Sequence, residues 1–181
     1  YTALQQAITP WDEKTLYIFC GDYLERGIEN KEMIYEMMRL STLPNTIMLE
    51  GNHERHIANF AFNSNLDHSK RFMKEVVAPI VKDMTKKDVE SLQRELRLFY
   101  KSLRQCYPFS FHGKKYLVSH GGLSYVPNMT FIATSTFING FGAYETDIAK
   151  IYDNNYEKGM CQNFIQIHGH RGVPDGKYSF C

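Results

Sequence analysis

Four residues that can bind metal ions each follow a short apolar run in this chain. Asp22 and Asn52 lie in the motifs GDYLERG and GNHE, and His120 and His170 each follow such a run further along. Carboxylate, amide and imidazole ligands together suit divalent ions such as Mn, Fe or Zn. Two such ions clamp the oxygens of a phosphate ester and lower the pKa of a bridging water, so that hydroxide can attack phosphorus. The four residues therefore predict a two-metal site for phosphate ester hydrolysis.

Three further residues of the same motifs have side chains suited to act on a substrate. Arg26 lies four residues beyond Asp22, and its guanidinium can donate two parallel hydrogen bonds to phosphate oxygens. His53 follows Asn52 directly and can protonate the departing alkoxide. Glu25 can orient that imidazole and raise its pKa. From spacing alone, we assign substrate binding to Arg26 and catalytic roles to His53 and Glu25.

Short strands and helices must position the residues of the N-terminal half. Leu4 and Ile8 share one face of a predicted helix over residues 2–8. Residues 15–20 and 46–49 are short apolar runs, which are typical of buried parallel strands, and residues 30–40 carry a helical stripe between them. Ligands of an open α/β sheet bind beyond the carboxyl ends of its strands, where the predicted site residues lie.

The C-terminal half first changes to a helical period and then returns to strands. Residues 66–106 carry two apolar stripes at helical spacing, and Thr85 is a candidate N-cap between them. The segment FSFHGKKYLVSHGG predicts a β-hairpin that turns at His112-Gly113, followed by a strand that leads to His120. FIQIHGH repeats the arrangement of a strand followed by a histidine. We expect His168 in this segment to support the site or the core.

Composition limits the class of protein. The chain has 181 residues, of which 43% are hydrophobic, which suits a single domain over residues 1–181. A net charge of +1 gives no global attraction to nucleic acid or to an anionic membrane. The four cysteines form no CxxC pair, which argues against a zinc knuckle. No run is apolar enough to cross a bilayer and no leader is visible, so we expect a cytoplasmic protein without a membrane partner.

The motifs GDxxxRG, GNHE, HGG and GH, in this order, resemble the calcineurin-like metallophosphoesterases. The resemblance is closest to the phosphoprotein-phosphatase branch, with its bacterial serine/threonine phosphatases and the phosphatase module of polynucleotide kinase-phosphatases. The motifs run from Gly21 to His170, which is nearly the whole chain. The resemblance implies an α/β fold, namely a four-layer αββα sandwich with a helical insertion at about residues 66–106.

The same resemblance implies a role for each motif residue. Asp22 would bridge two divalent ions, and the second ion would be completed by Asn52, His120 and His170. His53 would be the general acid, and Arg26 would hold the phosphate. Manganese is the metal that the family favours, while the ligand set also accepts Fe, Zn or Ni.

The chain departs from the family pattern at three places. The family opens with GDxHG, whose Asp and His hold the first metal, and this motif is absent from the sequence. We therefore expect the motif and its N-terminal strand to precede Tyr1, which makes the domain N-terminally incomplete. Glu25 stands where the family usually has Asp. Glu50 stands where eukaryotic protein phosphatases have Arg, which argues against their way of handling substrate.

The resemblance predicts a metal-dependent phosphomonoesterase similar to protein serine/threonine phosphatases. Its substrate would be a phosphoprotein or a small phosphoester. Three alternatives stay open: a phosphatase that heals nucleic-acid ends, a diadenosine tetraphosphate hydrolase, and a non-catalytic domain that retains the fold. Kinase or ligase domains flanking the segment in a longer chain would favour the nucleic-acid alternative. Glu54 and Arg55 are as consistent with support of the loop as with substrate contact.

Overall fold

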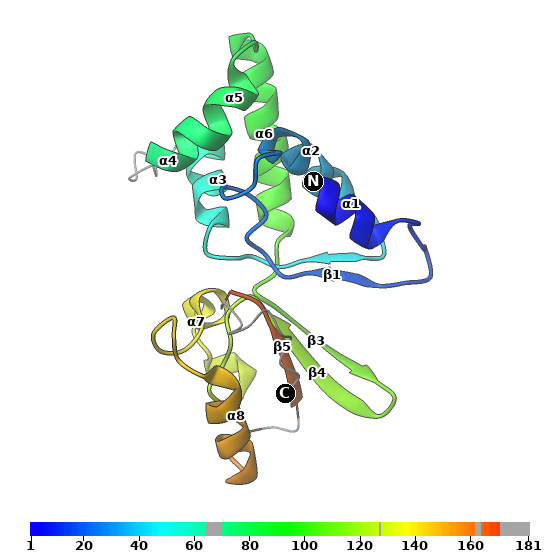
Figure 1. The fold of residues 1–181 in the computed structure, drawn as a ribbon, viewed down its shortest axis with the longest axis vertical. Coiled ribbons are helices and arrows are strands. Elements are labelled where there is room, and N and C mark those ends of the chain that lie inside the picture. Colours follow the sequence, from blue (N-terminus) through cyan, green and yellow to red (C-terminus); the bar gives the residue numbers. More distant parts are fainter. Residues whose placement is uncertain (64–69, 127, 162–163, 171–181) are drawn as a thin grey trace. The chain divides into compact units, whose positions relative to one another are not determined.

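The computed structural model describes residues 1–63, 70–126, 128–161 and 164–170 (Figure 1). These residues form two compact units. The first unit comprises Tyr1–Met48 and His53–Leu103, and the second comprises Leu49–Asn52 and the chain from Arg104 onward. Helices and two sheets are present, so the predicted α/β class is confirmed. The single domain and its four-layer packing stay predictions.

The first unit contains a two-stranded parallel sheet of β1 (Tyr17–Phe19) and β2 (Thr46–Met48), in which Ile18 pairs with Ile47. Both predicted strands are confirmed, as is their parallel pairing. The prediction that β1 is buried is wrong, because its three residues are only half-buried. The ring of Tyr17 stacks on Trp11, and its hydroxyl accepts a hydrogen bond from an exposed loop. An aromatic residue with a polar tip keeps one end near water.

The described residues of the first unit form seven helical segments: α1 (Thr2–Ile8), α2 (Asn30–Leu40), α3 (Glu54–Ala61), α4 (Lys70–Phe72), the π-helical η1 (Met73–Val77), α5 (Ala78–Val81) and α6 (Lys86–Ser102). Helices over residues 2–8 and 30–40 match the predictions. The predicted helical stretch of residues 66–106 is confirmed in its described part, except that it ends at Ser102; residues 66–69 lie outside the described residues. Thr85 caps α6 as predicted, through a reciprocal pair of hydrogen bonds with Asp88.

One apolar core holds the first unit together. Leu92, Leu96 and Phe99 of α6 belong to the same buried cluster as Met37 of α2 and Met48 of β2. Their spacing on α6 is three to four residues, which places them on one face of the helix. Figure 1 shows α6 and α2 on the same side of the two strands. The long helix therefore anchors the sheet whose strands lead into the site motifs.

The second unit contains a three-stranded sheet in the order β3, β4, β5. β3 (Cys106–Phe111) and β4 (Lys114–Ser119) are antiparallel, and β5 (Phe164–His168) runs parallel to β4. His112 and Gly113 form the turn as predicted. Their φ angles of 47° and 76° are both positive, as a two-residue type I′ hairpin requires.

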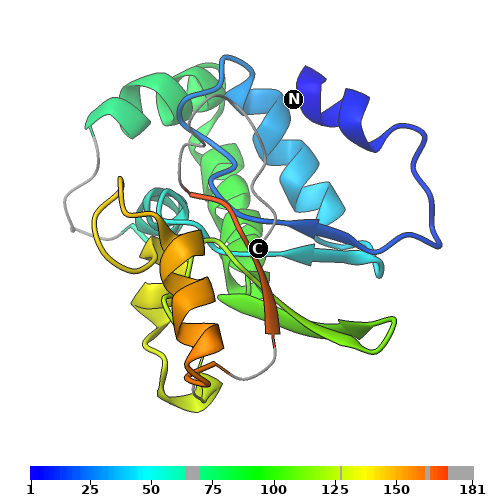
Figure 2. The ribbon, with the colours of Figure 1, turned by 60° about the horizontal axis from the view of Figure 1, so that its bottom comes forward.

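The remaining helices of the second unit are η2 (Met129–Phe131), α7 (Thr134–Asn139) and α8 (Ile148–Glu157). Leu117 of β4, Phe137 of α7 and Tyr152 of α8 share a second buried core. The hydroxyl of Tyr152 donates a hydrogen bond to the carbonyl of Phe164 at 2.9 Å. This bond ties α8 to β5, which lie side by side in Figures 1 and 2.

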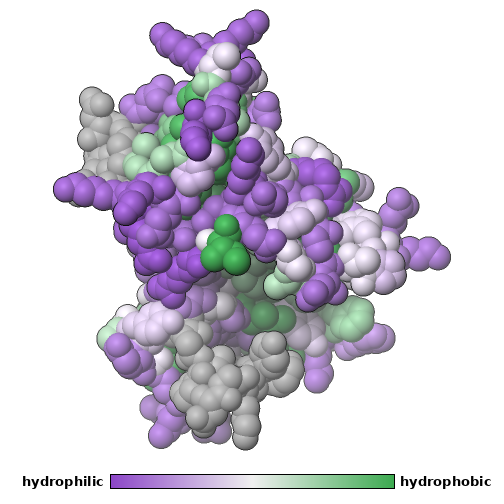
Figure 3. Space-filling view, turned by 45° about the horizontal axis from the view of Figure 1, so that its top comes forward, coloured by the Kyte–Doolittle hydropathy of each residue, from purple (hydrophilic) through white to green (hydrophobic). Residues whose placement is uncertain are grey.

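One face of the described surface is mostly polar. Figure 3 shows a largely hydrophilic face with isolated hydrophobic side chains. Ile28, beside the GDYLERG motif, is fully exposed, and such single residues are normal on soluble surfaces. Within the described residues, we find no helix with both the length and the apolar character that a bilayer crossing requires.

Candidate functional site

Asp22 lies just beyond β1 in a backbone conformation that few residues adopt. Its φ is 58°, and Gly21 before it has a φ of 87°. The N–H groups of Asp22 and Tyr23 donate hydrogen bonds to the carboxylate of Glu54, at 2.8 and 3.0 Å. Glu54 is fully buried as the first residue of α3, where the helix dipole favours a negative charge. Glu54 therefore fixes the turn that presents Asp22, which confirms the loop-supporting interpretation of this residue.

The loop after Asp22 is held by Asn30, which the sequence analysis did not single out. The N–H of Glu25, whose φ is 101°, donates to the side-chain oxygen of Asn30 at 3.0 Å. The side-chain amide of Asn30 in turn donates to the carbonyl of Gly27 at 2.8 Å. Asparagine commonly bonds to nearby backbone in turns, so an Asn at the start of a helix was the available signal.

His53 approaches both acidic residues of this loop. Its backbone N–H donates to a carboxylate oxygen of Asp22 at 3.1 Å. Its Nδ1 forms a short hydrogen bond with the carboxylate of Glu25, while its Nε2 lies 3.9 Å from the other oxygen of Asp22. The predicted contact between His53 and Glu25 is therefore present, and it leaves Nε2 on the side of Asp22.

A shallow pocket opens beside this group. It is lined by Asp22, Tyr23, Leu24, Arg26, Gly27 and His53. Arg26 is exposed and is one of the lining residues. The first unit thus brings Asp22, Arg26 and His53 to one pocket, with Glu25 behind the imidazole. A guanidinium and an imidazole around one opening suit an anionic ligand.

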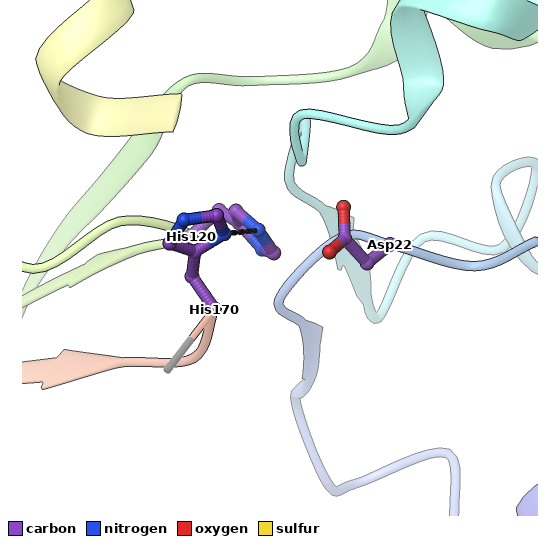
Figure 4. A group of neighbouring side chains, drawn as sticks. All are labelled: Asp22, His120 and His170. Atoms are coloured by element: carbon purple, nitrogen blue, oxygen red, sulfur yellow. Dashed lines mark hydrogen bonds between the residues drawn. The ribbon is translucent and has the colours of Figure 1, made fainter. Parts of the chain in front are cut away.

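The second unit brings together the other three predicted metal ligands. The Nε2 of His120 lies 3.2 Å from the side-chain oxygen of Asn52 and 3.0 Å from the Nδ1 of His170. Figure 4 shows the two imidazoles, one from the end of β4 and one from beyond β5, turned toward each other. His120 is buried, and His170 adopts a left-handed φ of 66°.

The spacing of these donor atoms fits a bound ion. Nitrogen and oxygen ligands of one ion, each about 2.1 Å from it, lie about 3 to 3.4 Å apart. The Nε2 of His120 has this spacing to both Asn52 and His170. His120 and His170 are also among the candidate metal ligands that geometry identifies. Two imidazoles and an amide oxygen suit a first-row divalent ion better than Mg²⁺ or Ca²⁺.

The two glycines after His120 are required by close packing. A Cβ on Gly121 would lie 2.0 Å from the backbone nitrogen of Gly140, and a Cβ on Gly122 would lie 3.0 Å from the Nε2 of His168. The N–H of Gly121 donates to the carbonyl of Phe137 at 2.6 Å. The HGG motif therefore lets the chain after His120 run directly against α7 and β5. His168 packs under this loop, as expected for a supporting residue.

A backbone hydrogen bond also joins the loops that carry His120 and His170. The N–H of Gly169 donates to the carbonyl of His120 at 3.1 Å. The side chain of Gln166, buried in β5, accepts from the N–H of Leu123 at 2.6 Å and donates to its carbonyl at 3.2 Å. Gln166 was not predicted as a supporting residue, although a polar residue within an otherwise apolar strand could have indicated such a role.

Left-handed backbone is concentrated at the predicted site residues. Five described residues other than glycine have a positive φ, and three of them are Asp22, Glu25 and His170. Such conformations cost of order 1–3 kcal/mol each and cluster at functional sites. Asp22 and Glu25 keep theirs because Glu54 and Asn30 bond to their N–H groups. The strained backbone is an observation separate from the sequence motifs, and it occurs at residues that the motifs also single out.

Comparison with known proteins identifies a family. The family model described as calcineurin-like phosphoesterase matches residues 1–180. None of the curated proteins compared with the chain matches it significantly. The match covers all seven predicted site residues.

Proposed function

Because the chain belongs to the calcineurin-like phosphoesterase family, and is therefore a metal-dependent hydrolase of phosphate esters, we propose that it is a phosphomonoesterase similar to protein serine/threonine phosphatases. The observation that carries this proposal is the contact of His53 with Glu25 beside Asp22. A proton donor for the leaving group is what an unactivated alkyl phosphate, such as phosphoserine, requires.

We propose that Asp22, Asn52, His120 and His170 hold two divalent ions, with manganese as the metal and Asp22 as the bridge. Divalent ions in such a site polarise phosphoryl oxygens and lower the pKa of a bound water. The spacing of Asn52 and His170 around His120 supports this assignment. The carboxylate of Asp22 supports it as well, because Glu54 fixes the backbone that presents it.

His53 would protonate the leaving alkoxide from Nε2. Its Nδ1 is engaged by the carboxylate of Glu25, which leaves Nε2 to carry the transferable proton. The buried carboxylate of Glu25 fixes the orientation of the imidazole through this hydrogen bond, so that Nε2 faces the pocket side where a leaving group would lie. The extra methylene of Glu25 compared with Asp does not prevent the contact.

Arg26 would bind the phosphoryl group. Arg26 lines the same pocket as Asp22 and His53. A guanidinium can donate two parallel hydrogen bonds to non-bridging phosphate oxygens, and it stabilises the charge that gathers there during cleavage. We therefore place the phosphate in this pocket, with the leaving group toward His53.

The test compares substrate classes under one condition. The full-length protein with added manganese should hydrolyse p-nitrophenyl phosphate and a phosphoserine peptide faster than it hydrolyses diadenosine tetraphosphate. Activity on phosphorylated oligonucleotide ends that exceeds peptide activity, and weakens as salt rises, would instead indicate a nucleic-acid phosphatase. A metal-loaded protein without turnover on any of these would show a non-catalytic member of the family.

A further inference from the structure

A second group of metal-ligating side chains lies in the first unit, apart from the histidines of the HGG and GH motifs. Glu25, His53 and His56 each offer a donor atom, and these three atoms all lie within 4.8 Å of one another. Two of the residues belong to the proposed proton-donor pair. His56 has no part in the proposed reaction and stands outside the motifs.

The start of α3 sets the positions of the two histidines. The N–H of His56 donates to the carbonyl of His53 at 3.0 Å, so one helical turn separates them and both side chains lie on one face. Their ring centroids are 6.3 Å apart. The ring of His56 also lies 5.5 Å from that of Phe72.

The donor set is the one that zinc prefers. Two imidazoles and a carboxylate form a common three-residue zinc site with an open fourth position. Imidazole ligands disfavour Mg²⁺ and Ca²⁺, which take oxygen ligands. Glu25 and His56 are both buried, at 8% and 9% exposure, so a cation there would balance a carboxylate that water solvates poorly.

The three donors need only small movements to bind one ion. Ligands of zinc lie about 3.4 Å apart, and the three donor atoms are already within 4.8 Å of one another. Glu25 and His53 are closer still, because they share a hydrogen bond. A zinc ion would take the place of the proton between them, with His56 turning to complete the set.

We propose that Glu25, His53 and His56 form an inhibitory zinc site. Zinc displaces protons from the ligands that it binds, and a zinc-bound His53 cannot protonate a leaving group. Zinc would therefore inhibit hydrolysis without displacing the ions of the proposed catalytic centre. The inhibitory effect rests on the proposed function, whereas zinc binding by the three side chains does not.

The inhibition experiment uses His56→Gln, since this change removes one ligand and leaves the proposed reaction intact. We expect the variant to keep the activity that the wild type has without zinc. Half-inhibition should need a zinc concentration about tenfold or more above that of the wild type, because loss of a residue that only hydrogen-bonds to a metal ligand already costs 10- to 100-fold in metal affinity. His112→Asn is the matched control, because it removes an imidazole from the hairpin turn, and it should respond to zinc like the wild type. Equal zinc sensitivity of His56→Gln and wild type would overturn the proposal.

A binding measurement keeps the proposal testable if His56→Gln does not fold or the protein shows no turnover. Zinc added to the wild-type protein with ¹⁵N-labelled histidines should shift the imidazole signals of His53 and His56 together, and leave those of His112 in place. A response confined to His120 and His170 would overturn the site, whatever the activity. Shifts at His53 and His56 without phosphatase activity would support the zinc site while contradicting the proposed function.

Discussion

The buried carboxylate of Glu54 accepts a hydrogen bond from the backbone N–H of Asp22 at 2.8 Å. These residues are 32 positions apart, in two different motifs. The bond holds Asp22 in a left-handed conformation with a φ of 58°. Because an unsupported conformation of this kind is costly, the last residue of GNHE determines where the aspartate of GDYLERG lies. The two motifs are therefore one structural element.

Glu54→Gln should lower both the free energy of unfolding and the metal affinity. An amide offers one acceptor oxygen, whereas the carboxylate accepts from both Asp22 and Tyr23 through its two oxygens. One of these part-buried N–H groups would lose its partner, which costs about 1 kcal/mol. Urea unfolding measures the change, and Glu75→Gln, which removes an exposed carboxylate on η1, is the control. Equal stability of both variants would show that Glu54 does not support the loop.

Local sequence patterns predicted most of the elements that position the site. The helix over residues 30–40 and the turn at His112-Gly113 follow from side-chain spacing and from the need for a positive φ, both of which are local properties. The half-buried state of β1 was not predictable, because burial depends on which segments pack against a strand. The same holds for the end of the helical stretch at Ser102.

The site itself was only partly visible in the sequence. The motifs identify side chains that can do chemistry, and the contacts of His53 with Glu25 and of His120 with His170 are present. The supports were not predicted, since Asn30 bonds to a loop whose path the sequence does not reveal. Backbone strain at Glu25 was equally invisible, because Glu gives no sign of a positive φ, and Asp, although enriched there, adopts it at only a few positions.

Gly121→Ala should be strongly destabilising. Its Cβ would lie 2.0 Å from the backbone nitrogen of Gly140, and a backbone atom cannot move aside as a side chain can. Overpacking of this kind costs about 3 kcal/mol or more. Gly27→Ala is the matched control, because its Cβ would meet only Asn30, at 4.0 Å. Thermal unfolding compares them, and equal melting temperatures would refute the packing argument.

Thr85→Ala should weaken the start of α6 by about 1 kcal/mol at neutral pH, since it removes an N-cap. Hydrogen bonds from the side chain and backbone of Thr85 hold the pKa of Asp88 below its ordinary value of 3.8. A lowered pKa contributes stability above the ordinary value, and this contribution is lost as pH falls through the lowered pKa.

The wild type should therefore lose more stability on acidification than Thr85→Ala does. Urea unfolding of both proteins, at neutral pH and at a pH well below the ordinary pKa of Asp88, measures the free energy of unfolding that each one loses. An equal loss of unfolding free energy in the two proteins would show that the cap does not depend on the charge of Asp88. Thr42→Ala, which removes an exposed hydroxyl that bonds to Arg39, controls for loss of a threonine.

His53→Ala should slow poor leaving groups far more than good ones. An alkyl phosphate needs a proton on its departing oxygen, so its rate should fall by about 100-fold or more. p-Nitrophenyl phosphate leaves as a stabilised anion and should lose much less. His112→Ala, in the hairpin turn, should change neither rate. Equal losses on both substrates would rule out His53 as the general acid.

Hydrolysis should depend on a metal ion held by His120, and manganese-dependent turnover of p-nitrophenyl phosphate by the full-length protein measures this dependence. Activity should appear with manganese and disappear with a chelator. His120→Ala should lower kcat/KM by about 100-fold or more, since even loss of a residue supporting a ligand costs 10- to 100-fold. Turnover unaffected by the chelator, or by His120→Ala in a folded protein, would contradict a role for a metal at His120.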